Sequence, residues 1–252
     1  MSETIKQTGY PSKLRLHEKD ATFFQKHPVI PGCSIFSLIK YASRKYRKEI
    51  AIEDVGKKIS FERLIENAQI LARSLYRIGL QKGDILTMVV PNCYQGIELF
   101  LAANSIGVIV TFLNSHATVQ EVERYLKMYG SSVLVKEKYT EEDKKILCGE
   151  GNTRCIITLE QMPSQHAENA VISYESLLNR KSKGIQRSIG IKNCEAMILY
   201  TSGTTGNPKS VVLTNKNIIA TAIYLKKSSH VTQQSGEKSL VCVPFCYPYG
   251  FV

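Results

Sequence analysis

The sequence lacks an apolar run long enough to cross a membrane. A spanning helix needs about 20 predominantly apolar residues, whereas the longest apolar stretch, residues 97–113, is interrupted by Glu98 and Asn104. The first 20 residues are polar and do not resemble the apolar region of a secretory signal. We therefore expect a protein with no integral membrane segment.

Paired cysteines are also missing, although the chain contains seven cysteines. Their number is odd, their spacing is wide, and no CxxC pair occurs, so neither a disulfide framework nor a zinc site is indicated. The five histidines likewise show no spacing typical of a metal site or a catalytic triad. We expect the cysteines to be small buried hydrophobic residues in a cytoplasmic protein that holds no metal through its own side chains.

Basic residues are abundant but hardly clustered. Lys and Arg number 33 against 22 Asp and Glu, which gives a formal net charge of +11. Such an excess suits nucleic acids, anionic membranes or polyanionic small ligands. The densest basic stretch, Arg44–Lys48, is interpreted as the solvated face of a helix. Because a nucleic-acid interface would need interleaved aromatic residues or a known module, we expect no nucleic-acid partner.

Strand and helix patterns alternate along most of the chain, which is long enough for one large domain or two small ones. The predicted strands are residues 84–90, 107–113, 131–135, 154–159, 196–200, 210–214 and 239–243. Strands that are apolar throughout and alternate with helices are typical of parallel sheets buried on both faces. The predicted fold class is therefore α/β, with doubly wound, largely parallel sheets and flanking helices.

Polar residues mark where the helices and turns are expected. The predicted helix N-caps are Ser34, Ser60, Thr118 and Asn215. Thr118 is followed at the right spacing by Glu121, which predicts a capping box. Residues 54–57 separate two short strand patterns and predict a hairpin turn. Residues 161–193 are polar and predict a connection rich in loops, while residues 1–33 lack periodicity and predict an N-terminal arm before a domain at 34–252.

The strongest chemical signal is the segment YTSGTTGNPKS, from Tyr200 to Ser210. Its glycines let backbone N–H groups approach a ligand closely, and its hydroxyl groups and lysine can hold phosphate oxygens. It is not a Walker A motif, because Pro208 stands where the second glycine is required, and no GxGxxG occurs. The alternative is an ordinary turn rich in Ser, Thr and Gly, but the order and spacing favour a phosphate-binding loop.

This segment closely resembles the phosphate-binding signature of the acyl-adenylate-forming enzymes, which include acyl-CoA synthetases, 4-coumarate–CoA ligase-like enzymes and luciferases. The resemblance extends to KISFERL, LARSLYRIGLQKGDILTMVVPNC, GVIVTFLNSHATVQEVERYL and PFCYPYGF. It implies that residues 34–252 are the incomplete N-terminal large domain of the adenylate-forming fold, with the C-terminal half of the family's chain absent. It also implies that residues near 34–75 belong to a second sheet and lack much of their packing partner.

The resemblance implies a function as well: ATP-dependent activation of a fatty or aryl acid to an acyl-adenylate, with Mg²⁺, followed by transfer to CoA. The residues implied to hold the ATP phosphates are Thr201, Ser202, Gly203, Thr204, Thr205, Gly206 and Lys209. Tyr247 stands where the family usually has histidine, and both Tyr247 and Tyr249 are implied to face the acyl substrate. Ordinary packing is the alternative interpretation of these two tyrosines.

Three hypotheses follow from the sequence. The first is a ligase of the acid–thiol type, represented here by its N-terminal part and inactive in isolation. The second is a catalytically incompetent fragment that binds a nucleotide or phosphate. The third is a basic nucleic-acid-binding protein, which the phosphate motif disfavours. The resemblance favours the first hypothesis.

Overall fold

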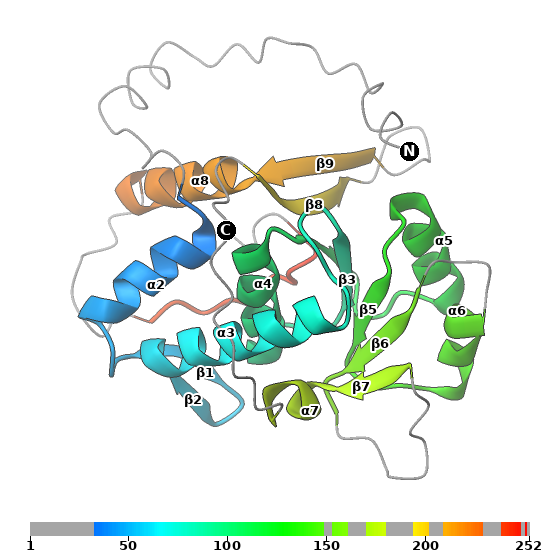
Figure 1. Cartoon of the computed structure of the whole chain (residues 1–252). Coiled ribbons are helices and arrows are strands. Elements are labelled where there is room, and N and C mark those ends of the chain that lie inside the picture. Colours follow the sequence, from blue (N-terminus) through cyan, green and yellow to red (C-terminus); the bar gives the residue numbers. More distant parts are fainter. Residues whose placement is uncertain are drawn as a thin grey trace. The chain divides into compact units, whose positions relative to one another are not determined.

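A seven-stranded sheet organises the part of the chain that the computed structural model describes (Figure 1). The described residues are 33–148, 153–160, 170–179, 194–201, 209–228, 238–247 and 250. The strands of this sheet are β3 (Ile85–Val89), β4 (Ile109–Leu113), β5 (Val133–Lys136), β6 (Cys155–Thr158), β7 (Val171–Ser173), β8 (Glu195–Thr201) and β9 (Lys209–Thr214). Their spatial order is β7-β6-β5-β3-β4-β8-β9. All neighbours are parallel except β8 and β9, which confirms the predicted fold class.

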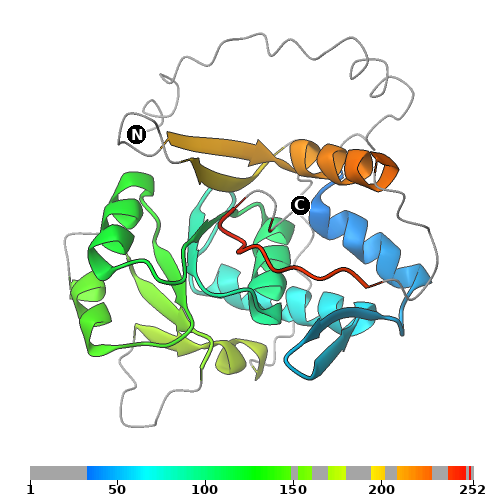
Figure 2. The same ribbon diagram turned by 180° about the vertical axis from the view of Figure 1, so that it is seen from behind.

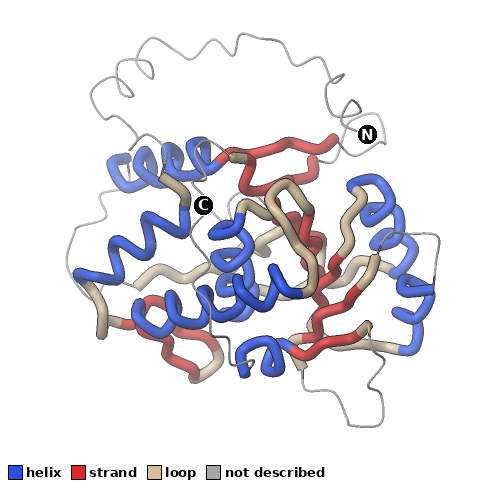
Figure 3. The backbone as a smooth tube through the Cα atoms, viewed as in Figure 1, coloured by secondary structure: helices blue, strands red, loops and turns tan. Residues whose placement is uncertain are grey.

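Successive side chains of the central strands point to opposite faces of the sheet and enter two separate cores. Val133 and Val135 belong to the larger core, whereas Leu134 between them belongs to the smaller one. The larger core is covered by α2 (Ile35–Lys45), α3 (Phe61–Arg77), α4 (Tyr94–Ile106) and α7 (Tyr174–Asn179), and α8 (Asn215–Ser228) adds to it. The smaller core is covered by α5 (Val119–Tyr129) and α6 (Lys144–Cys148). Figures 2 and 3 show α5 and α6 grouped together, away from α2 and α3.

Within residues 34–75, helix α3 is packed better than expected. The α3 side chains Leu71 and Leu75 are fully buried, and eight residues of this helix are buried in all. The expectation that this region lacks its packing partner is therefore wrong for α3, because its apolar stripe lies against α4 and the large core. The strands β1 (Ile50–Asp54) and β2 (Lys57–Ser60) do form a separate two-stranded antiparallel sheet.

The hairpin and most of the helix caps are confirmed. Val55 and Gly56 both have positive φ, at 41° and 78°, as a two-residue hairpin of type I′ requires. The side chains of Ser34 and Ser60 accept hydrogen bonds from backbone N–H groups three residues later. Thr118 forms the full capping box with Glu121, which satisfies two N–H groups that would otherwise lack a partner.

The predicted cap at Asn215 is wrong. The residue that caps α8 is Thr214, whose hydroxyl accepts a hydrogen bond from the backbone N–H of Asn217 at 3.2 Å. Asn215 is buried, and its Oδ1 accepts from the backbone N–H of Ile35 and from Nδ2 of Asn104, both at 2.9 Å. The side chain of Asn215 thus links α8 to α2 and α4, and it does not cap the start of α8.

Two further expectations are corrected. The connection at 161–193 contains β7 and α7, and Tyr174 and Leu177 of α7 are buried. Residues 239–243 form no strand, and Leu240 is 91% exposed. An apolar run alone does not distinguish a buried strand from an extended segment that other side chains hold on the surface.

The expectation for the cysteines is met only in part. Cys155 is buried, but Cys242 is exposed. None of the described residues forms a cluster of three or more His, Cys, Asp or Glu that could hold a metal ion. In the described part of the chain, no helix combines the length and the apolar character that a membrane span requires.

Candidate active site at the carboxyl edge of the sheet

The order of the strands creates a switch point at β3. The chain runs from β3 to β4 on one side and then crosses to β5 on the other side of β3. In open parallel sheets, ligands bind in the crevice outside the carboxyl ends of the strands at such a point. Because β8 is parallel to β4, its carboxyl end reaches the same edge. The segment that follows β8 is the predicted phosphate-binding motif.

The predicted phosphate-binding motif is closed by the ends of β8 and β9. Tyr200 pairs with Ser210 and Thr201 pairs with Lys209 in antiparallel register. The two outermost predicted phosphate ligands therefore lie opposite each other at the base of the intervening segment. The others, Ser202 to Gly206, lie outside the described residues.

Contacts between aromatic rings join the end of β8, where the motif begins, to α5. The ring of Tyr200 lies 4.4 Å from that of Tyr125 and 5.5 Å from that of Tyr129, measured between centroids. Burial raises the pKa of the Tyr200 phenol, so this side chain is uncharged. Thr111 of β4 also donates a hydrogen bond to the carbonyl of Ile198 at 3.1 Å. These contacts place β8 beside β4 and α5.

A second segment, residues 238–247, crosses the same edge. Lys238 at its start forms an ion pair of 2.7 Å with Glu53 of β1. Phe245 near its end is buried against Phe112 of β4, with ring centroids 5.6 Å apart. Figure 2 shows this segment in red, running across α4. It thus connects the β1–β2 hairpin to the carboxyl end of β4.

Tyr247 lies on a turn at the end of this segment. Its backbone N–H donates to the carbonyl of Pro244 at 3.0 Å, and its own carbonyl accepts from Gly250 at 3.0 Å. Tyr247 is 50% exposed in this chain. Tyr249, the other predicted substrate residue, lies outside the described residues.

The β1–β2 hairpin is fastened to the start of α4. Asp54 accepts a hydrogen bond of 2.9 Å from the backbone N–H of Tyr94, and it caps a helix whose own N-cap, Cys93, forms no side-chain cap bond. Lys57 lies over the Tyr94 ring, 4.3 Å from its centroid. The sequence analysis missed these contacts, because a cap supplied by a distant strand leaves no signal in local spacing.

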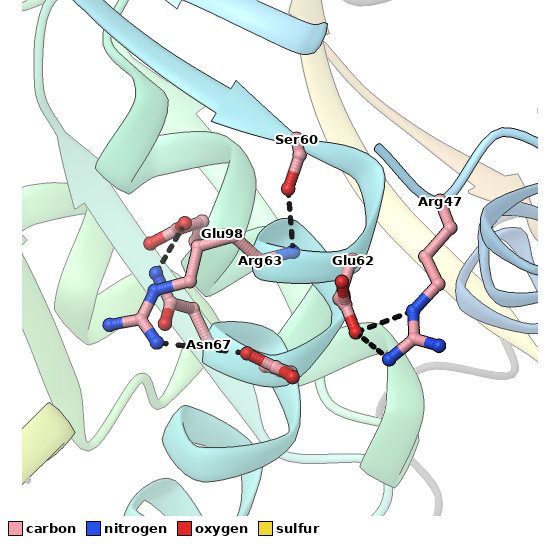
Figure 4. A network of polar contacts seen from close by, with 7 residues as sticks. Arg47, Ser60, Glu62, Arg63, Asn67 and Glu98 are labelled. Carbon is pink, nitrogen blue, oxygen red and sulfur yellow. Dashed lines mark hydrogen bonds and ion pairs between the residues drawn. The ribbon is translucent and has the colours of Figure 1, made fainter. Parts of the chain in front are cut away.

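A buried carboxyl group supports α4 from inside the fold. Glu98 is fully buried, and it accepts hydrogen bonds from Asn67 of α3, at 2.9 Å, and from the hydroxyl of Tyr174 of α7. Desolvation raises the pKa of Glu98 above its ordinary value. Figure 4 shows Glu98 facing Asn67, with the exposed Arg47–Glu62 pair farther along. Three helices behind the site are thereby joined through one side chain.

One known protein family matches most of this chain. The family model described as "AMP-binding enzyme" matches residues 39–252. Among curated proteins, the chain is 32% identical to 4-coumarate–CoA ligase 3 of Arabidopsis thaliana over 151 residues, covering 59% of this chain and 26% of that protein. It is 26% identical to a long-chain-fatty-acid–CoA ligase of Bacillus subtilis, covering 88% of this chain and 43% of that protein. The chain thus spans less than half the length of these relatives.

Solved structures share the fold. A putative long-chain-fatty-acid CoA ligase from Rhodopseudomonas palustris superposes with a TM-score of 0.66 at 18% identity, over 78% of this chain and 48% of that one. The N-terminal subdomain of NpsA from Klebsiella oxytoca, in complex with 3-hydroxybenzoyl-AMSN, gives a TM-score of 0.58 at 22% identity, over 73% and 42%. At identities of 18% and 22%, these similarities show a shared fold and nothing about function.

Proposed function

The chain belongs to the AMP-binding enzyme family, and from that premise we propose that it supplies the ATP phosphate site of an acid-activating ligase. The observation that carries the proposal is the position of the YTSGTTGNPK motif, which begins at the end of β8, at the switch-point edge of a parallel sheet. We propose that residues 34–252 are the N-terminal part of an adenylation domain, preceded by an arm at 1–33.

In this proposal the ATP phosphates bind to the motif between β8 and β9. The ligands are Thr201, Ser202, Gly203, Thr204, Thr205, Gly206 and Lys209. Lys209 at the start of β9 supplies positive charge, and the hydroxyl and backbone N–H groups donate hydrogen bonds to phosphate oxygens. Mg²⁺ bound with the nucleotide would neutralise further phosphate charge.

The proposed reaction joins a carboxylic acid to AMP. A carboxylate oxygen attacks the α-phosphorus of ATP, the bond from that phosphorus to the bridging oxygen breaks, and pyrophosphate leaves. The residues of this chain would contribute by positioning the phosphates and by offsetting the charge on the departing pyrophosphate.

The substrate class and the second step are also proposals. The relatives named above are a 4-coumarate–CoA ligase and a long-chain-fatty-acid–CoA ligase, so we propose an aryl or fatty acid, with CoA as the acceptor of the acyl group. We further propose a cytoplasmic location, since the seven cysteines are odd in number, widely spaced and without a CxxC pair, as is usual in a reducing compartment.

The test is carboxylate-dependent exchange between ATP and pyrophosphate. We expect exchange from the full-length protein that carries this chain, and none from the 252-residue chain, because the matched relatives are more than twice as long. The competing hypothesis is a catalytically incompetent fragment that binds nucleotide or phosphate. It is favoured if the full-length protein binds ATP but exchanges no pyrophosphate with any fatty or aryl acid.

Tyr247 gives a prediction about substrate choice. Its half-exposed phenol stands on a turn at the carboxyl edge of the sheet, and a phenol can donate a hydrogen bond but carries no positive charge near neutral pH. In the full-length protein, Tyr247→His is expected to change the ratio of kcat/KM between acids by roughly tenfold to a few hundredfold. The KM for ATP is expected to stay nearly constant.

The measurement compares a short aliphatic, a long aliphatic and an aryl acid. Tyr224→His is the matched control, because Tyr224 is also about half exposed but lies on α8. Equal loss of kcat/KM with all three acids would reject a place for Tyr247 in the substrate site.

A further inference from the structure

Asn92 holds the segment that carries Tyr247. This residue follows β3, and its amide contacts residues about 150 positions later in the chain. Its Nδ2 donates to the carbonyl of Val243 at 2.8 Å and, over a longer distance of 3.4 Å, to that of Val241. Its Oδ1 accepts from the backbone N–H of Phe245 at 2.9 Å. One side chain therefore satisfies both donors and acceptors of an extended backbone.

These bonds replace the sheet pairing that residues 239–243 do not make. A strand neighbour would offer alternating N–H and C=O groups, and the primary amide of Asn92 offers the same two kinds of group. The segment needs such a partner, because Leu240 and Val241 are largely exposed and give it little apolar burial. Together with the buried ring of Phe245 and the Lys238–Glu53 ion pair, the amide of Asn92 holds this backbone at the sheet edge.

Asn92 also stands at the switch point. It comes three residues after Val89, the last residue of β3, and is followed by the N-cap of α4, Cys93. The short turn between β3 and α4 therefore sets the position of its amide. Phe245, which bonds to Asn92, follows Pro244, and the carbonyl of Pro244 accepts from the backbone N–H of Tyr247, so the bonds of Asn92 reach the turn that carries Tyr247.

We propose that Asn92 is a positioning residue that determines where Tyr247 stands and thereby which carboxylic acids the site accepts. This inference rests on the proposed function, since it assigns Tyr247 to the acid site. The inference concerns binding of the acid and not of ATP. Asn92 contacts the 238–247 segment, whereas Tyr125 and Tyr129 pack against Tyr200 at the base of the phosphate motif.

The first test measures the segment directly by hydrogen–deuterium exchange and thiol alkylation of the chain. In Asn92→Ala we expect the Phe245 amide to exchange at least tenfold faster and the partly buried Cys246 to be alkylated faster. Buried Cys155 should stay slow and exposed Cys242 should stay fast. Asn92→Asp keeps an acceptor for the Phe245 N–H but places a carboxylate oxygen against the Val243 carbonyl, so faster exchange than in the wild type is expected at Phe245 here too.

Asn114→Ala is the matched control. Asn114 follows β4 at the same edge, but it is exposed, and its side chain accepts a local hydrogen bond from the backbone N–H of His116, two residues later. This variant should leave the exchange at Phe245 unchanged. If Asn92→Ala exchanges there at the wild-type rate, the positioning role is wrong, whatever the activity of the enzyme.

The second test uses the full-length protein. Asn92→Ala is expected to raise the KM for the preferred acid about tenfold or more and to reduce the ratio of kcat/KM between that acid and the others. The KM for ATP is expected to stay within about twofold of the wild-type value. Faster exchange with unaltered preference among acids would overturn the link between Asn92 and substrate choice. Absence of any acid-dependent activity in the wild type would instead contradict the proposed function, and the exchange measurement would still decide whether Asn92 holds the segment.

Discussion

Replacing Glu98 by alanine is expected to lower the free energy of unfolding by about 3–5 kcal/mol. The change removes a fully buried side chain and leaves the amide of Asn67 and the hydroxyl of Tyr174 without their shared acceptor. Each buried polar group left unpaired costs about 1–3 kcal/mol, and the cavity adds to that cost. Urea unfolding of the chain, followed by circular dichroism, measures the difference.

Glu98→Gln is the matched variant for this prediction. Glutamine keeps the volume and one acceptor oxygen and resembles the neutral carboxyl group. Because Glu98 accepts through both oxygens and glutamine offers only one, one of the two donors loses its acceptor, and the expected loss of stability is about 1–3 kcal/mol. If alanine is tolerated as well as glutamine, the hydrogen bonds to Asn67 and Tyr174 contribute little, and the helices α3, α4 and α7 are held by apolar packing alone.

Glu98 also predicts a pH dependence. Desolvation raises its pKa in the folded chain above the ordinary value of 4.5, so the folded state binds the proton more tightly than the unfolded state. The resulting contribution to stability is complete below about pH 4.5 and is lost as pH rises through the higher folded pKa. Relative to Glu98→Gln, the wild type should therefore lose stability as pH increases above 4.5. Parallel curves for the two proteins would contradict this assignment.

The difference between Glu98 and the capped helices shows what local sequence can reveal. Ser60 was predicted as a cap from its residue type before a helical pattern, and Thr118 from its residue type and from Glu121 three positions later, and the bond that each cap makes is local. Glu98 was noted only as an interruption in an apolar run, since its partners lie 31 and 76 residues away. A buried carboxyl group with distant partners has no local signature.

The same reasoning explains the errors at Asn215 and at residues 239–243. Thr214 and Asn215 are adjacent, and both residue types are common N-caps, so local pattern could not decide which of them caps α8. The tertiary contact of Asn215 with Ile35, 180 residues away, decides it. The apolar run at 239–243 predicted a strand, but its hydrogen bonds go to Asn92. The alternation of β3 to β6 with helices, by contrast, was sufficient to predict the parallel sheet.

The proposed phosphate site also predicts a large effect on ATP binding when Lys209 is replaced. In the full-length protein, Lys209→Ala is expected to raise the KM for ATP by roughly tenfold to a hundredfold with acid saturating. The reason is that a charge-assisted hydrogen bond to a phosphate is worth about 1.5–3 kcal/mol. The KM for the acid, with ATP saturating, should change little, because Lys209 lies beside Thr201 at the base of the phosphate motif, whereas Tyr247 lies on the separate 238–247 segment.

Lys216→Ala is the control for this substitution. Lys216 is exposed like Lys209 and lies seven residues later, in the first turn of α8, so its loss removes the same charge from a nearby position without touching the motif. An equal rise in the KM for ATP in both variants would mean that the general positive field of the chain attracts the nucleotide. An unchanged KM for ATP in Lys209→Ala would mean that the segment between β8 and β9 is only a turn. Only a rise confined to Lys209→Ala supports direct phosphate binding, because a general field would be weakened similarly by either change.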